Sequence, residues 1–299
     1  MHTLFKDIYH GRAGNQPACL KVLRLITEPD EEVREIIRKR FCNEALVWRQ
    51  LKHRNILPLL GVNAELFKPS FCIISPWMDN KDIITYLKRN PTRNRSEVLL
   101  DVASGISYLH SMDPPIVHGD IRGGNILVAD DLRCCIADFG LSLTTAGSQS
   151  WINAVTSTMK GSMRWMAPEL FHHDGSLELH LNHLSRDVYA FGCTILEILT
   201  LQLPFYDRKT DYMVFAALMA GERPVRPNNV WYPDEIWDLT TRCWAQETTT
   251  RPTAHDVYSV LQWSAASYIT KGGQSPVTDI TIISPVYRGG FAVSITCCK

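Results

Sequence analysis

The sequence predicts an α+β fold of two lobes, in which a small strand-rich lobe precedes a larger helical lobe. The first third of the chain holds short apolar runs typical of strands and one amphipathic helix. After Pro76 the apolar residues recur instead at helical spacing. A chain of 299 residues is long enough for one domain of this size, with a cleft between its two lobes.

The expected small lobe spans about 1–77 and holds three strands and one helix. Residues 17–25 form an apolar run that predicts a strand, and the runs at 56–62 and 71–77 predict two more. A helix is expected over 30–52, because acidic residues fill its first turn, where they complement the helix dipole.

The expected large lobe spans about 81–264 and is helical. Its most apolar segment, 187–200, predicts a helix buried on all sides. Gly221 is placed where a glycine ends the preceding helix. The other helices are expected at 96–111, 209–220, 234–243 and 253–263.

Charge and cysteine content exclude several classes of protein. Lys plus Arg and Asp plus Glu both number 31, so no basic surface points to a nucleic acid or to anionic lipid. The longest apolar stretch, Val188–Leu199, is too short for membrane insertion, and the N-terminal residues lack a signal-peptide core. The 9 cysteines include no CxxC pair, which predicts a reducing, cytoplasmic setting without zinc or disulfides. The oligomeric state stays open.

Five short elements follow one another in an order that carries chemistry. They are Lys21 in ACLKV, Glu44 in FCNEALVW, HGDIRGGN at 118–125, ADFG at 137–140 and MAPE at 166–169. Each is weak alone, but together the chain resembles the protein kinase superfamily from about Asp7 to Trp263. The segments GSMRWMAPE and RDVYAFG resemble the tyrosine-kinase-like group. The resemblance implies a two-lobed protein kinase fold that uses ATP and Mg²⁺ and acts on a protein substrate.

Lys21 and Glu44 are predicted to form an ion pair. Glu44 shares a helix face with Phe41 and Trp48, and a carboxylate on an apolar face needs a partner. The resemblance implies that Lys21 holds the α- and β-phosphates of ATP. The alternatives are a lysine that extends from an edge strand to water, and a surface glutamate.

The motif HGDIRGGN is expected to form the catalytic loop. The resemblance implies that Asp120 accepts the proton of the substrate hydroxyl, or orients it, and that Arg122 keeps a positive charge near the γ-phosphate. Asn125 and Asp138 would bind Mg²⁺, which prefers oxygen ligands. The alternative, a plain polar turn, accounts for Gly123 and Gly124 but not for a buried Asp and Asn.

The resemblance also implies contacts that bind the nucleotide or hold the lobes together. Ser75, Trp77 and Met78 would contact the nucleotide beside a hinge near Pro76–Asn80. His118 is expected to have a packing role. Further expectations are that Phe139 packs between the lobes, that Glu169 pairs with Arg251, and that Asp187 braces the catalytic-loop backbone.

Gly119 departs from the kinase pattern, because many kinases have Arg there to receive a phosphorylated activation segment. The segment Asp138–Glu169 is rich in hydroxyl residues, and phosphate orders a loop only where a cation receives it. We therefore predict that phosphorylation of this segment is not the main switch. Ser162 replaces a Thr that usually supports serine/threonine substrates, while Arg122 also occurs in tyrosine kinases.

The phosphate-covering glycine loop is missing from its expected place. Residues Met1–Lys6 fill those positions and contain no glycine, which indicates a truncated product or incomplete nucleotide binding. Within the tail 265–299, residues 277–295 resemble a first strand with a glycine loop. We favour the start of a second, truncated kinase domain over completion of the first domain in place. A disordered tail is the third reading.

The predicted function is ATP- and Mg²⁺-dependent transfer of the γ-phosphate to protein Ser or Thr hydroxyls, with activity weakened by the missing glycine loop. Its main alternative is a pseudokinase that acts as a protein-binding scaffold. A small-molecule phosphotransferase is less favoured, because MAPE and the helix at 209–220 resemble protein-substrate elements.

Overall fold

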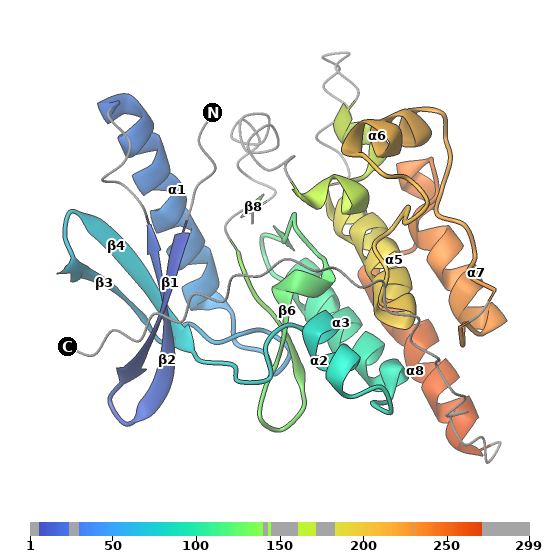
Figure 1. Cartoon of the computed structure of the whole chain (residues 1–299), viewed down its shortest axis with the longest axis horizontal. Helices are drawn as coiled ribbons and strands as arrows, with labels where there is room; N and C mark the ends of the chain where they lie inside the picture. Colours follow the sequence, from blue (N-terminus) through green and yellow to red (C-terminus); the bar gives the residue numbers. More distant parts are fainter. Residues whose placement is uncertain are drawn as a thin grey trace, which may run out of the picture.

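The computed structural model describes residues 6–23, 30–139, 143–144, 161–171, 183–228 and 230–270. A small sheet with one long helix lies on one side of the molecule, and a helical body lies on the other (Figure 1). The predicted α+β architecture of two lobes is therefore confirmed. The change from strands to helices occurs after Pro76, as expected.

The small lobe is a four-stranded antiparallel sheet with strand order β1-β2-β4-β3. The strand expected at 17–25 is β2 (Gln16–Leu23), and the one expected at 71–77 is β4 (Ser70–Pro76). The first strand, β1 (Lys6–Ala13), pairs with β2 along its whole length. The last, β3 (Gly61–Phe67), borders β4.

The prediction of a strand over 56–62 is wrong, because β3 begins only at Gly61. Ile56 and Leu57 are buried, but they belong to a connection that enters the core, where the Leu57 N–H donates to the Ile136 carbonyl at 2.9 Å. Their apolar character therefore reports burial rather than strand pairing. Most of β3 is exposed, including apolar residues such as Leu66, so its sequence has no apolar face of the kind that predicts a half-buried strand.

The helix expected over 30–52 is α1 (Glu31–Gln50). The carboxylate of Asp30 caps its N-terminus by accepting the Glu32 N–H at 2.8 Å. Phe41, Glu44 and Trp48 are all buried. The Trp48 indole N–H donates to the Leu57 carbonyl at 2.5 Å, which fixes the C-terminal end of α1 against the core.

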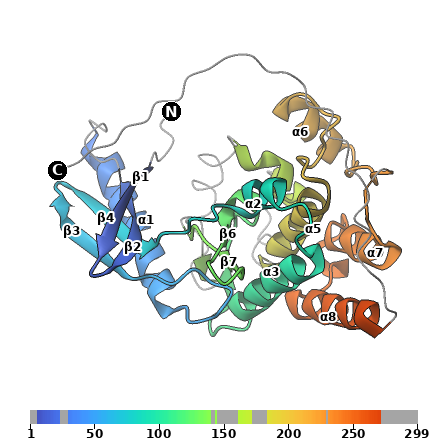
Figure 2. The ribbon, with the colours of Figure 1, turned by 60° about the horizontal axis from the view of Figure 1, so that its bottom comes forward.

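The large lobe is built around α5 (Leu184–Thr200), which is buried continuously from Ser185 to Leu199, as its composition predicts. Helix α3 (Arg95–His110) packs against both α5 and α8, and Figure 2 shows these three helices side by side. The remaining helices are α2 (Ile83–Arg89), α6 (Asp211–Met219), α7 (Asp234–Cys243) and α8 (Ala254–Thr270).

Three helices, α2, α6 and α8, show where the sequence pattern predicts helix bounds and where it does not. Helix α2 was not predicted, although Asp82 caps it by accepting the Thr85 N–H at 2.9 Å. Gly221 ends α6 as predicted, with a φ of 75° that suits a residue without Cβ. Helix α8 continues to Thr270, beyond the domain limit expected at 264.

Four short strands complete the described part of the large lobe. Strands β6 (Ile126–Val128) and β7 (Cys134–Ile136) pair with each other, and β5 (Ile116–Val117) pairs with β8 (Leu143–Thr144). The segment Gly119–Asn125 joins β5 to β6 and includes the short helix η1 (Gly123–Asn125). Within the described ranges, none of the helices has the length and apolar character needed to cross a bilayer.

Candidate active site

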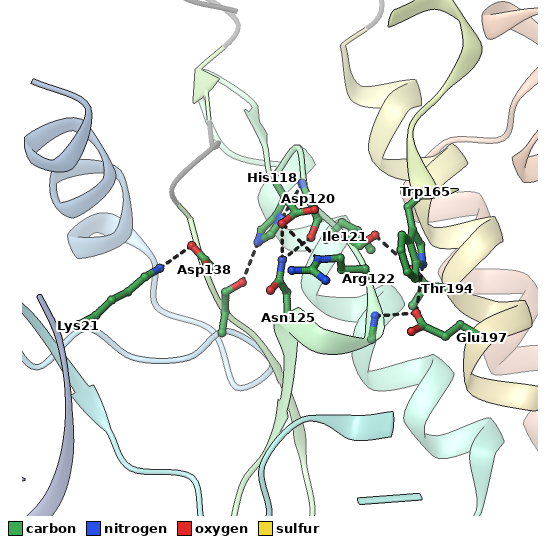
Figure 3. Close-up of polar contacts among 12 residues, drawn as sticks. Lys21, His118, Asp120, Ile121, Arg122, Asn125, Asp138, Trp165, Thr194 and Glu197 are labelled. Carbon is green, nitrogen blue, oxygen red and sulfur yellow. Dashed lines mark hydrogen bonds and ion pairs between the residues drawn. The ribbon is translucent and has the colours of Figure 1, made fainter. Parts of the chain in front are cut away.

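Lys21 links the two lobes through two carboxylates. Its ammonium lies 3.3 Å from Oε1 of Glu44 on α1 and 2.5 Å from Oδ1 of Asp138 (Figure 3 shows the second contact). The side chain of Glu44 is 2% exposed, so its charge is almost fully removed from water. The predicted Lys21–Glu44 pair is confirmed, and the reading of Glu44 as a surface residue is excluded.

Asp138 follows β7 and keeps part of its carboxylate accessible. Its side chain is 43% exposed although Oδ1 contacts Lys21. Its φ of 65° lies in the left-handed region, where Asp is tolerated better than most side chains. This conformation directs Asp138 and Phe139 into different surroundings.

Phe139 packs between the lobes, as predicted. Its ring is fully buried and lies 5.4 Å from the Trp48 ring of α1 and 5.1 Å from the His118 ring of the catalytic loop. The contact joins a small-lobe helix to the segment that bears Asp120.

Asp120 and Asn125 are held together in the catalytic loop. Nδ2 of Asn125 donates to the Asp120 carbonyl at 2.8 Å and to Asp120 Oδ2 at 2.7 Å (Figure 3). Because the amide nitrogen faces Asp120, the amide oxygen of Asn125 is directed away from it. Nε of Arg122 lies 3.4 Å from Asp120 Oδ2, and the Arg122 side chain is 33% exposed.

Asp187 braces the backbone of this loop, as predicted. Its carboxylate accepts the His118 N–H at 2.7 Å and the Gly119 N–H at 2.8 Å, and His110 Nε2 lies 3.0 Å away. Burial alone would raise the pKa of Asp187, but the hydrogen bond and electrostatic interaction with His110, the electrostatic interaction with His118 and the Gly119 N–H together more than offset it, so the pKa is lowered. The carboxylate therefore remains ionised at neutral pH.

His118 serves the packing of the loop, as expected. Its Nε2 lies 3.1 Å from the Ala137 carbonyl, and its Nδ1 accepts the Asp120 N–H at 3.2 Å. Both ring nitrogens are thus engaged with backbone groups. This arrangement fixes the start of the Asp120 segment.

The comparison with known proteins assigns the family. Residues 2–261 match the family described as protein tyrosine and serine/threonine kinase. The chain belongs to this family. Its recognition from five dispersed motifs is therefore confirmed, and the lobes described above are those of a protein kinase domain.

Three curated relatives show the extent of the similarity. Serine/threonine-protein kinase STY46 of Arabidopsis thaliana is 27% identical over 264 residues, which cover 86% of this chain and 42% of STY46. Serine/threonine/tyrosine-protein kinase HT1 of the same plant is 29% identical over 261 residues, covering 85% of this chain and 62% of HT1. Dual specificity protein kinase splA of Dictyostelium discoideum is 29% identical over 261 residues, which cover 80% of this chain and 10% of splA. The kinase chain thus spans less than two thirds of each relative.

The residues of the kinase site are chemically suited to bind Mg²⁺ and a nucleoside triphosphate. Asp138 and Asn125 both carry side-chain oxygens that can coordinate Mg²⁺. Their segments lie side by side, since the Ala137 N–H donates to the Asn125 carbonyl at 2.8 Å. Lys21 supplies an ammonium beside Asp138 for phosphate oxygens. The assignment of these residues as ligands stays a prediction.

The three residues predicted beside the hinge lie where β4 leaves the sheet, but they face different partners. Ser75 is buried and lies opposite Cys19 of β2 in the sheet register. The Trp77 N–H donates to the Pro17 carbonyl at 3.2 Å, and its indole N–H donates to Asp79 at 2.9 Å. Met78 packs against the core. Their contact with a nucleotide stays a prediction.

Gly119, in place of the usual kinase Arg, has a φ of 81°. This left-handed conformation favours a residue without Cβ, and it allows the Gly119 N–H to reach Asp187. The backbone conformation at this position therefore favours glycine. The same glycine also removes the positive charge that an Arg would bring to the activation segment.

The predicted pair of Glu169 and Arg251 is confirmed as a bidentate contact. The guanidinium nitrogens of Arg251 lie 2.7 and 2.9 Å from the two carboxylate oxygens, and the Arg251 side chain is 0% exposed. Nε of Arg251 also donates to the Ala245 carbonyl at 2.9 Å. The end of the activation segment is thereby fastened to the helical lobe.

Glu197 was not among the site residues that the sequence predicted. Its Oε2 accepts the Gly123 N–H at 2.9 Å and the Trp165 indole N–H at 3.0 Å (Figure 3). Thr194, on the same helix, donates to the Ile121 carbonyl at 3.3 Å. The available signal was a lone carboxylate within the apolar stretch Val188–Leu199.

Some predictions lie outside the described residues. They concern Met1–Phe5 at the position of the glycine loop, most hydroxyl residues of the activation segment, and the strand-like segment 277–295.

Proposed function

We propose that this chain transfers the γ-phosphate of ATP to Ser or Thr hydroxyls of a protein, with Mg²⁺ as cofactor. The observation that carries the proposal is the contact of Lys21 with Asp138, beside the Asp120–Asn125 pair. Phosphoryl transfer depends mainly on positioning and charge neutralisation, and these groups provide both. Mg²⁺, when bound, would neutralise charge on the phosphate oxygens.

Each proposed role follows from chemistry and placement. Asp120 has a carboxylate that accepts the proton of the substrate hydroxyl or orients that hydroxyl. Arg122 extends a guanidinium beside Asp120, where it can contact phosphate oxygens. Asn125 and Asp138 offer oxygen ligands, while Lys21 is kept in place by Glu44.

A preference for Ser and Thr is supported by the names of the relatives, of which STY46 is a serine/threonine-protein kinase. The name of splA as a dual specificity kinase makes tyrosine a second acceptor to be measured. A peptide array with matched Ser, Thr and Tyr acceptors decides between them. The rival function, a pseudokinase scaffold, requires that no acceptor is phosphorylated.

Replacing Lys21 with Met is expected to lower phosphate transfer by roughly 100-fold or more, because it removes the cation beside the phosphates. Mg-ATP should also raise the Tm of the variant less than that of the wild type. Lys39→Met is the matched control, since Lys39 lies on the outer side of α1 with its side chain 73% exposed. Equal transfer by the Lys21 and Lys39 variants would contradict the role of Lys21.

Phosphorylation of the activation segment is expected to be dispensable. We predict that alanine at Thr144, Thr145, Ser148, Ser150, Thr156, Ser157 and Thr158 leaves most transfer activity intact. The receiving Arg is replaced by Gly119, so phosphate there gains no such contact. A folded variant that loses activity and recovers it with Asp at these positions would overturn the prediction.

The organisation of the chain also remains a proposal. We propose that the kinase unit is 1–264, extended by the end of α8 to Thr270, and that the rest of the tail to 299 is a separate segment, favoured as the start of a second kinase domain. A cytoplasmic location is proposed from the buried free thiols, such as Cys134 and Cys193.

A further inference from the structure

Glu197 is a buried carboxylate on α5, the helix that is buried from Ser185 to Leu199. It is 5% exposed, and its neighbours along α5 are buried as well. A carboxylate in such surroundings costs free energy unless polar groups compensate for the lost water. The hydrogen bonds that Glu197 accepts supply this compensation.

The two donors to Glu197 come from segments that are far apart in the sequence. One oxygen, Oε2, accepts both the Gly123 N–H of the catalytic loop and the Trp165 indole N–H of η3 (Met163–Trp165). Trp165 is buried and immediately precedes the MAPE segment. A single oxygen atom thus joins the loop that bears Asp120 to the end of the activation segment.

Gly123 is suited to this close approach. A Cβ on Gly123 would lie 3.0 Å from Glu197 Cδ and 2.4 Å from Ile84 Cγ1. The absence of a side chain therefore lets the loop backbone reach the carboxylate.

Burial, hydrogen bonds and nearby charges together set the pKa of Glu197. Burial raises the pKa of Glu197 to about 7, although the hydrogen bonds from Gly123 and Trp165 act in the opposite direction. Arg122 also lowers this pKa and Asp82 raises it. Among the described residues, the two N–H donors hold the carboxylate, and no cationic side chain there makes an ion pair with it.

We propose that Glu197 is a positioning residue that couples Trp165 to the catalytic loop and thereby sets the alignment of Asp120 and Arg122. The proposal rests on the phosphotransfer function proposed above. If it holds, the Trp165 indole controls the transfer step without contacting ATP. Its loss lowers kcat and leaves the KM for ATP unchanged.

The test compares Trp165→Phe, Glu197→Leu, Glu197→Gln and the double variant Trp165→Phe with Glu197→Leu. Trp165→Phe and Glu197→Leu should each lower kcat roughly tenfold, and the double variant should fall no further than Glu197→Leu. Glu197→Gln keeps an acceptor oxygen and should recover most of the activity. Thr240→Val is the control, because Thr240 is a buried residue of α7 whose hydroxyl bonds Tyr232 and Ile236.

Amide hydrogen exchange of a peptide covering 121–125 provides a readout that does not depend on activity. Trp165→Phe should speed exchange in this peptide, whereas Thr240→Val should not. Unchanged exchange in Trp165→Phe, or additive losses of kcat, would overturn the coupling. If the wild type transfers no phosphate, the proposed function fails, while the exchange experiment still decides the role of Glu197.

Discussion

Phosphate transfer is expected to fall by roughly 10²–10⁴-fold when Asp120 is replaced with asparagine, while nucleotide binding is retained. The amide keeps the shape of the side chain but cannot accept the substrate proton. Asn125, which now donates to Asp120 Oδ2 at 2.7 Å, still finds an amide oxygen there. The measurement is the rate of radiolabelled phosphate transfer, with Tm in Mg-ATP as the measure of binding.

Asp131→Asn provides the matched control for this experiment. Asp131 makes an ion pair with Arg133 on the surface, and its side chain is 53% exposed. The same chemical change at that position should leave transfer near the wild-type rate. Transfer that persists in Asp120→Asn would show that another group acts as the base.

Replacing Arg251 with Met is expected to destabilise the domain by about 3–5 kcal/mol, because the change leaves Glu169 without its buried partner. The Ala245 carbonyl, which accepts the Arg251 Nε–H at 2.9 Å, loses a donor as well. For a domain of this size the change corresponds to a Tm lower by roughly 6–20 °C. Calorimetry or thermal unfolding monitored by circular dichroism measures it.

Arg38→Met is the comparison for the stability experiment. Arg38 makes ion pairs with Glu31 and Glu35, whose side chains are 65% and 50% exposed. Surface pairs of this kind contribute little because water and salt screen them. Similar losses of Tm in the two variants would refute the importance assigned to the Glu169–Arg251 contact.

The contacts that the sequence predicted best join residues of opposite charge within recognised motifs. Lys21 with Glu44, and Glu169 with Arg251, are pairs in which each charge requires the other once buried. Glu197 escaped prediction because its partners are a backbone N–H and an indole, and neither leaves a charge pattern in the sequence.

The misplaced strand has a related cause. Apolar residues such as Ile56 mark burial, but burial is shared by strands and by connections that cross the core. Strand β3 lies at the sheet border with exposed residues such as Leu66, so it lacked a one-sided apolar pattern. The distinction depends on tertiary contacts that a local window does not contain.

The packing of Phe139 has a thermodynamic consequence for the whole domain. Its ring contacts Trp48 of α1 and His118 of the catalytic loop, next to the carboxylate that pairs with Lys21. A partner protein that favours one position of α1 must therefore alter nucleotide affinity, if the nucleotide also favours one position of that helix. Linkage requires the nucleotide to change the affinity for that partner by the same factor. Under that condition, binding of a partner at α1 and binding of a nucleotide at the phosphate site are thermodynamically coupled.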